Sequence, residues 1–426
     1  MSVVIWSLRG EEPSFRLPTS RLSDIPLIYG GERTLYELAF AAAELGFDVE
    51  LRGGIARDVF QELASASPGP APRVNLRPRR PRRDDIVILP EGIDTPNAYV
   101  TALMSPARVV IMLLAPPGLF GPALHDRWSR PNPLTVPVDA VGRPDQFQPL
   151  AALGLEVWTN SPGIAHDCIA AGVACVELGS GTPVPFPDLV PKTHDLAVIT
   201  ANRWAKLARA VAAKVDASCL TIPPQGNGLL PLALGRARIL VWPSRIEGDS
   251  RIQREARAMG TVPVALSSNR NAAQLDAEHG AVLVESVDAM PGAIARLLES
   301  PAELDALSNI AVHSARAQVD WQRYKESVRD ALTSPRPAQR RFLQTAGDMA
   351  DQERRRADAL MARVTAELRA SRAKAAQLEA QLTAELELAE AEVLHLRGRR
   401  AIRMADGVGE VVRSMRPTRA ATKNRP

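Results

Sequence analysis

Short apolar segments alternate with helix-like segments along the first 185 residues of the chain. The apolar segments have the length and β-branched composition of buried strands, and we expect strands at 3–6, 48–51, 86–89, 109–114 and 156–159. Helices are predicted over 34–46, where Thr34 and Glu37 would form a capping box, and over 161–171. This alternation is typical of a parallel sheet whose strands are joined by crossover helices.

The same alternation starts again after a glycine- and proline-rich stretch at 179–187. The predicted strands are 195–200, 218–222, 238–242, 262–266 and 281–284, and the predicted helices are 204–215, 250–259, 288–299 and 301–319. We therefore expect an α/β protein with two tandem Rossmann-like, doubly wound domains over 1–185 and 186–334, with a hinge at 179–187.

From Pro335 the composition changes to alanine, arginine, glutamate and leucine, with almost no strand-forming residues up to Leu396. One heptad seat, at 361, 368, 375, 382, 389 and 396, reads Met, Leu, Ala, Leu, Ala, Leu. The other seat, at 364, 371, 378, 385 and 392, reads Val, Ser, Leu, Glu, Glu, so the apolar seam weakens towards its end. The pattern predicts a coiled coil over 335–396 that pairs two chains.

The last segment, 397–426, is strongly basic. It carries nine lysines and arginines against Asp406 and Glu410, whereas the net charge of the whole chain is only +4. Apolar residues recur at helical spacing among these arginines, which suits a helix on an anionic membrane surface. An ordinary solvated tail, or a segment that contacts nucleic acid, would have the same charge. We expect peripheral membrane contact and disfavour nucleic acid as a partner.

Composition and charge exclude several classes of protein and of site. The residues after Met1 read as a strand at 2–6 without the basic flank of a secretory signal, and no run approaches the roughly 20 apolar residues of a membrane span. A cytoplasmic protein is expected. The arginine-rich stretch 78–83 is interpreted as a solvated loop, because no aromatic residues are interleaved with it. Three cysteines and six scattered histidines predict neither a disulfide framework nor a metal site.

Two glutamates carry the candidate chemistry. Glu247 is expected in the turn after the strand 238–242, outside the carboxyl end of a parallel strand, where ligands of open sheets bind. Glu255 lies eight residues further on, inside the next helix. The spacing alone favours two surface glutamates in salt bridges on an arginine-rich helix, because glutamates eight residues apart are common.

The start of that helix is a candidate site for an anion. The backbone N–H groups of Ser250, Arg251 and Ile252 have no acceptor within the helix and would form a positive concavity. A nucleoside diphosphate would fit there. One glutamate would then bond ribose hydroxyls, and the other would face the sugar of a nucleotide-sugar donor.

The residues around the pair resemble a known family. Pro-Ser-x-x-Glu-Gly around Glu247 and Glu-Ala-x-Ala-x-Gly-x-x-Pro-Val from Glu255 are similar to the E-x7-E signature of retaining GT-B glycosyltransferases related to glycogen synthase, often called glycosyltransferase family four. The resemblance implies two domains that face a cleft and a last helix near 320–334 that returns to the first domain. It also implies that Glu255 binds the donor ribose and that Glu247 lies beside the donor sugar.

Two more segments resemble the family. In 201–206, Arg203 and Lys206 are similar to the cations that grip the donor diphosphate, although their spacing is shorter than usual. Gly30-Gly31 is similar to the glycine pair before the first helix, where backbone amides approach the phosphate. Glu32 and Arg33 stand beside the pair without an assigned role.

The sequence also departs from the family pattern. No histidine follows the central strand in 109–117, and His125, the nearest, is interpreted as too far along for catalysis. Ser250-Arg251 stands where relatives have a glycine and an aliphatic residue. Either Arg251 adds a phosphate contact, or the donor differs from that of the relatives. The stretch 178–187 lacks the asparagine and aspartate of the family hinge.

Taken as a member of this family, the chain would be a retaining, metal-independent hexosyl- or glycosyltransferase. It would move a sugar from a nucleoside diphosphate-sugar, its co-substrate, to a hydroxyl of a glycan or lipid-linked acceptor, and no other cofactor is expected. Such acceptors suggest cell-surface polysaccharide or glycolipid assembly. Two alternatives stay open: a non-catalytic GT-B-like scaffold that acts through its coiled coil, and a sugar-nucleotide epimerase of the same fold.

Overall fold

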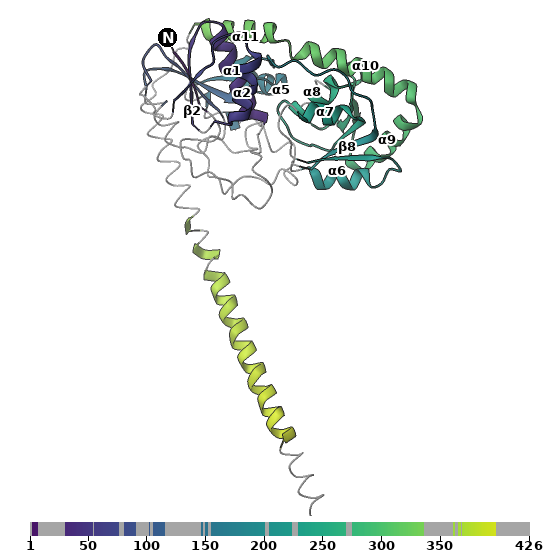
Figure 1. Ribbon diagram of the computed structural model, residues 1–426. Coiled ribbons are helices and arrows are strands. Elements are labelled where there is room, and N and C mark those ends of the chain that lie inside the picture. Colours follow the sequence, from purple (N-terminus) through teal and green to yellow (C-terminus); the bar gives the residue numbers. More distant parts are fainter. Residues whose placement is uncertain are drawn as a thin grey trace, which may run out of the picture. The chain divides into compact units, whose positions relative to one another are not determined.

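The computed structural model contains two compact units, Met1–Ala350 and Asp351–Pro426. It describes residues 2–6, 30–53, 55–75, 81–90, 102, 105–115, 146–147, 150–151, 155–200, 204–223, 229–269, 275–335, 361–362, 365–367 and 369–397. The first unit contains two parallel sheets with helices between and around their strands (Figure 1). The predicted α/β class with two doubly wound, Rossmann-like halves is confirmed.

The first sheet has seven parallel strands in the order β3-β2-β1-β4-β5-β6-β7. Their bounds are β1 Ser2–Trp6, β2 Asp48–Arg52, β3 Arg73–Asn75, β4 Ile86–Pro90, β5 Arg108–Leu113, β6 Glu156–Thr159 and β7 Cys175–Glu177. All five predicted strands are present. The two edge strands, β3 and β7, were not predicted, because three residues give no periodic signal and β3 lies in a proline- and arginine-rich stretch.

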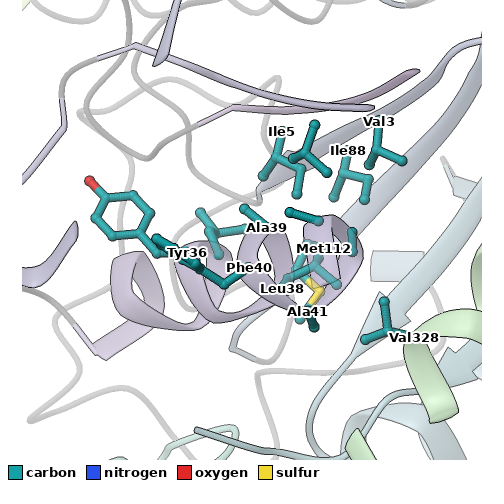
Figure 2. Packing of buried hydrophobic residues seen from close by; sticks show 14 of the residues in the cluster. Val3, Ile5, Tyr36, Leu38, Ala39, Phe40, Ala41, Ile88, Met112 and Val328 are labelled. Atoms are coloured by element: carbon teal, nitrogen blue, oxygen red, sulfur yellow. The ribbon is translucent and has the colours of Figure 1, made fainter. Parts of the chain in front are cut away.

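Helix α1, Gly30–Glu44, is the centre of the first core. Figure 2 shows Leu38 and Phe40 of α1 near Ile88 and Met112 of the sheet. Nearly every residue from 32 to 43 is buried, because α1 also packs against α2, Arg57–Ala66, and against α11, Trp321–Thr333. A helix that is enclosed on several sides is expected to be apolar around much of its circumference.

The predicted start of α1 was wrong. The helix begins at Gly30, so Thr34 and Glu37 lie within it and form no capping box. Both side chains are buried. Glycine is a weak helix former, and for this reason the sequence pattern placed the start one turn too late.

The second sheet has five parallel strands in the order β12-β11-β10-β8-β9. Their bounds are β8 His194–Ile199, β9 Cys219–Ile222, β10 Ala237–Trp242, β11 Val262–Leu266 and β12 Val282–Val284. The helices are α6 Ala205–Ala212, α7 Leu229–Gly235, α8 Arg251–Ala258, α9 Met290–Glu299 and α10 Pro301–Gln318. Only α7 was not predicted. Successive residues of β8 enter two separate cores, Val198 one and Ala197 the other, so helices cover both faces of the sheet.

The chain returns to the first core through α11, Trp321–Thr333. Tyr324 and Val328 belong to the same apolar cluster as α1, and the two helices lie side by side (Figure 1). Glu44 at the end of α1 accepts hydrogen bonds from Trp321 Nε1 at 3.1 Å and from Lys325 Nζ at 2.9 Å. α11 therefore follows the second sheet in sequence but packs with the first.

The second unit contains a helix over the described residues between 361 and 397. Its described side chains are exposed, including Leu378, Leu382 and Leu394. Coiled-coil pairing stays a prediction, and the basic tail beyond Arg397 lies outside the described residues. None of the helices that the structure describes is both long and apolar enough to cross a membrane.

Candidate donor-binding site

The strand order of the second sheet indicates where a ligand would bind. β8 lies between β9 and β10, so the chain leaves β8 and β10 in opposite directions along the sheet. Open α/β sheets bind ligands at this switch point, outside the carboxyl ends of the strands. Glu247 lies in the segment that follows β10 and is half-buried. Arg203, which follows β8, lies outside the described residues.

Gly248 brings this segment against the first sheet. A Cβ at Gly248 would lie 2.5 Å from the carbonyl oxygen of Leu114, directly after β5, so a larger residue would collide with backbone. The Oγ of Ser161, just before α5 (Pro162–Ala170), donates to the Gly248 carbonyl at 3.3 Å. The carboxyl ends of strands from both sheets therefore meet at the Glu247 segment.

Asp249 is the centre of a buried polar cluster that the sequence pattern did not identify. Its Oδ2 accepts hydrogen bonds from Ser180 Oγ at 2.7 Å and from Asn160 Nδ2 at 3.1 Å, and it forms an ion pair with Arg254. Arg254 Nη1 also donates to Ser180 Oγ at 2.7 Å. Burial lowers the pKa of Arg254, against the opposing effect of Glu37 and Glu255. The cluster joins the 178–187 stretch to the segment after β10.

Glu255 lies inside α8, and its residue surface is only 6% exposed. Its Oε1 accepts a hydrogen bond from Arg251 Nε at 2.7 Å. Its Oε2 is buried and has no hydrogen-bond partner among the described residues. A buried carboxylate oxygen without a donor is costly, so this atom is a candidate acceptor for a ligand hydroxyl.

Arg251 is bound by carboxylates from two different helices. Its Nη1 and Nη2 donate to the two oxygens of Glu37 on α1, at 2.9 and 3.0 Å, while its Nε binds Glu255. Burial alone would lower the pKa of Arg251, but the two carboxylates outweigh it and the pKa is raised. The side chain predicted as a phosphate contact thus joins α1 to α8.

Glu37 is correspondingly held in its charged form. Burial would raise its pKa, but the guanidinium groups of Arg251 and Arg33 outweigh it, and the pKa is lowered. Arg33 Nε binds Glu37 at 3.3 Å, and its Nη1 binds Glu62 at 2.6 Å. Arg33 had no assigned role in the sequence analysis. In the structure it belongs to this series of ion pairs, between Glu37 and Glu62.

The amino end of α8 has the features of an anion site. Ser250 is the N-cap in extended conformation and makes no side-chain cap hydrogen bond, and the first turn contains no acidic residue. The N–H groups of Ser250, Arg251 and Ile252 belong to the turn whose donors have no acceptor within the helix. Their alignment with the positive end of the helix dipole favours an anion.

The other predicted residues are more scattered. Gly30 and Gly31 form the first turn of α1 instead of preceding it. Lys206 lies in the first turn of α6 and is exposed. His125 lies outside the described residues. Within the described part of the chain, no three His, Cys, Asp or Glu side chains are grouped so that they would hold a metal ion. The three cysteines, Cys168, Cys175 and Cys219, are not disulfide-bonded.

Comparison with known proteins identifies the architecture. No family model matches the sequence, and no curated protein sequence matches it. The structure nevertheless superimposes on a sucrose-phosphate synthase from Thermosynechococcus elongatus, with a TM-score of 0.55 and 12% identity, over 78% of this chain and 98% of the other. The chain has the GT-B fold. It also superimposes on HepE from Anabaena, solved in complex with UDP and glucose, with a TM-score of 0.52 and 11% identity, over 79% of this chain and 100% of the other.

At these identities the similarity concerns the fold. It covers almost the whole of each solved GT-B structure, whereas about a fifth of this chain lies outside it. In this chain the Glu247 segment and the amino end of α8 follow the carboxyl end of β10 in the second Rossmann-like half.

Proposed function

We propose that the chain is a retaining glycosyltransferase that moves a sugar from a nucleoside diphosphate donor to a hydroxyl group of an acceptor. The observation that carries the proposal is the buried Oε2 of Glu255, which has no partner among the described residues and belongs to the helix whose amino end faces the switch point. The solved structures of similar fold support it, since one is named as a sucrose-phosphate synthase and another was crystallised with UDP-glucose.

In this proposal the second domain, 186–334, holds the donor. Glu255 accepts hydrogen bonds from the ribose, and the amides of Ser250 to Ile252 bind the diphosphate. Arg203 and Lys206 balance the charge that develops on the departing nucleotide, which lowers the barrier by electrostatic stabilisation. This charge balance by side chains is why we propose a reaction that needs no metal ion.

Glu247 faces the donor sugar in the same proposal. The segment that carries it is fixed by the close approach of Gly248 to Leu114 and by the hydrogen bonds of Asp249. A carboxylate held in place on a rigid segment can orient sugar hydroxyls without reorganising during the reaction. Glu247 is therefore proposed as the residue that positions the transferred sugar.

The first domain, 1–185, would bind the acceptor and close over the donor. Gly30 and Gly31, as the first residues of α1, have N–H groups without acceptors in the helix, and these would approach the donor phosphate. Closure excludes water, which otherwise competes as an acceptor and hydrolyses the donor. We propose a glycan or lipid-linked acceptor, in cell-surface polysaccharide or glycolipid assembly.

A screen of nucleotide sugars tests the proposal. The purified full-length chain is incubated with a panel of uridine, adenosine and guanosine diphosphate sugars, and release of the nucleoside diphosphate is followed. For an α-linked donor, we expect slow hydrolysis of one nucleotide sugar in the absence of an acceptor. When a hydroxyl acceptor is added, the product should carry the sugar in an α-linkage. Absence of turnover with every donor would favour the scaffold instead.

A further inference from the structure

Arg251 connects the candidate ribose ligand to the first half of the molecule. Its guanidinium makes a bidentate ion pair with Glu37 of α1, at 2.9 and 3.0 Å, and its Nε binds Glu255 Oε1 at 2.7 Å. The side chains of Glu37 and Glu255 are 5% and 8% exposed, and that of Arg251 is 16% exposed. All three groups are thus largely withdrawn from water, where charge-assisted hydrogen bonds are strong.

The two oxygens of Glu255 are divided between two tasks. Oε1 is occupied by Arg251, whereas Oε2 is buried without a partner among the described residues. Because one oxygen is anchored, the carboxylate cannot rotate freely, and the direction of its second oxygen is set. A fixed acceptor loses less conformational freedom when it binds a hydroxyl than a mobile one.

Glu37 is itself anchored by a second arginine. Arg33 Nε binds its Oε1 at 3.3 Å, and Arg33 Nη1 binds Glu62 at 2.6 Å. Thr182 adds a side-chain hydrogen bond to Glu37. The resulting series alternates in sign from Glu62 to Glu255, and it determines where the Arg251 guanidinium lies.

We propose that Arg251, held by Glu37, is a positioning residue that aims Glu255 at the vicinal hydroxyls of the donor ribose. The inference rests on the proposed function, because it assigns a role within the same donor site. It goes further in making a helix of the first domain a part of that site. Affinity for the ribose then depends on the contact between α1 and α8, so that donor binding and the joining of the two halves favour each other.

Substitution of Glu37 provides the test, with uridine diphosphate and 2′-deoxyuridine diphosphate as the probes. If adenosine or guanosine diphosphate binds the wild-type chain more tightly, that nucleotide and its 2′-deoxy form are used. Dissociation constants are measured by titration calorimetry. The wild-type chain should prefer the ribonucleotide by about 10-fold or more, as expected for a hydrogen bond to a charged group.

In Glu37→Gln the ion pair is lost and Arg251 is free to move. We expect the preference for the ribonucleotide to fall to about 2-fold, because a Glu255 carboxylate that is no longer held in position makes little distinction between the two nucleotides. Arg251→Lys keeps the positive charge but loses the planar guanidinium that makes two parallel hydrogen bonds to Glu37. This variant should show a similar fall in the preference for the ribonucleotide. The double variant should show the same preference for the ribonucleotide as Arg251→Lys alone, because both changes break the same ion pair between Glu37 and Arg251.

Glu44→Gln is the matched control. Glu44 is on the same helix, equally buried, and paired with Lys325, but it lies two turns from Glu37. This variant should lose stability yet keep the wild-type preference for the ribonucleotide. If Glu37→Gln keeps that preference as well, the inference is overturned while the proposed function stands. A wild-type chain that binds no nucleoside diphosphate overturns both.

Discussion

Glu37 is a buried carboxylate that faces mainly cations, and its protonation should therefore affect stability. Arg251, Arg33 and Arg254 lie around it, together with the hydroxyl groups of Thr182 and Tyr324. Its pKa is lowered from the usual value of 4.5. A carboxyl group with a lowered pKa in the folded state contributes stability above the pKa of the unfolded chain, and this contribution is lost as pH falls through the folded value.

We predict that Glu37→Gln lowers the free energy of unfolding by about 3–5 kcal/mol at pH 7, the usual effect of breaking a buried ion pair. The difference between the variant and the wild type should begin to shrink as pH falls below about 4.5, because the Glu37 carboxyl of the unfolded chain is protonated there while the folded one stays charged. It should be lost once pH falls through the lower pKa of the folded state. Urea unfolding between pH 3 and 7 measures this. Glu303→Gln is the control: its pair with Arg296 is exposed and is expected to contribute at most about 1 kcal/mol at any pH. A difference for Glu37→Gln that does not change with pH would contradict the prediction.

At the scale of elements, a buried arginine adds hydrogen bonds between the first sheet and α11 to their apolar packing. Arg108 at the start of β5 pairs with Glu156 at 2.6 and 2.8 Å and donates to the carbonyls of Ala331 and Leu332 at the end of α11, at 3.0 and 3.3 Å. A cation at the carboxyl end of a helix also interacts favourably with the helix dipole. Arg108 thus stabilises both the sheet and the returning helix.

Arg108→Met should be strongly destabilising. It leaves the Glu156 carboxylate buried without its cation, a change that typically costs about 3–5 kcal/mol. Amide hydrogen exchange should accelerate most in the last turn of α11, which loses its capping donor. Lys214→Met is the control, because its pair with Asp288 is exposed and contributes about 0–1 kcal/mol. Unchanged stability and exchange in Arg108→Met would refute this account of how α11 is held.

The helices and strands differ in how well they could be predicted from the sequence. Each central strand was predictable because a strand buried on both faces leaves a continuous apolar run. The short edge strands β3 and β7 and the glycine start of α1 leave no such signal. The same division applies to the site: Glu247, Glu255 and the start of α8 follow from a local motif. The Glu37–Arg251 contact joins residues 214 positions apart and has no local pattern.

At the scale of the whole molecule, the exposed helix of the second unit predicts a dimer. Leu382 occupies a predicted heptad seat and is 64% exposed, and Leu394, 67% exposed, lies on the opposite side of the heptad. We expect the full chain to sediment at twice its mass of 46.0 kDa. Leu382→Lys should shift it towards the monomer, whereas Leu394→Lys should not. A wild-type monomer, or equal behaviour of both variants, would exclude pairing through this seam.

In the proposed reaction the two halves of the GT-B fold act together, and donor binding depends most on Glu255. The most direct measurement is the turnover of the preferred nucleotide sugar by the wild type and by Glu255→Ala, compared side by side in the full-length chain. We predict that the variant stays folded and that its kcat/KM for the donor falls by about 10- to 100-fold, the loss expected when a hydrogen bond to a charged group is removed. Equal kcat/KM in the two proteins would contradict the donor site described above.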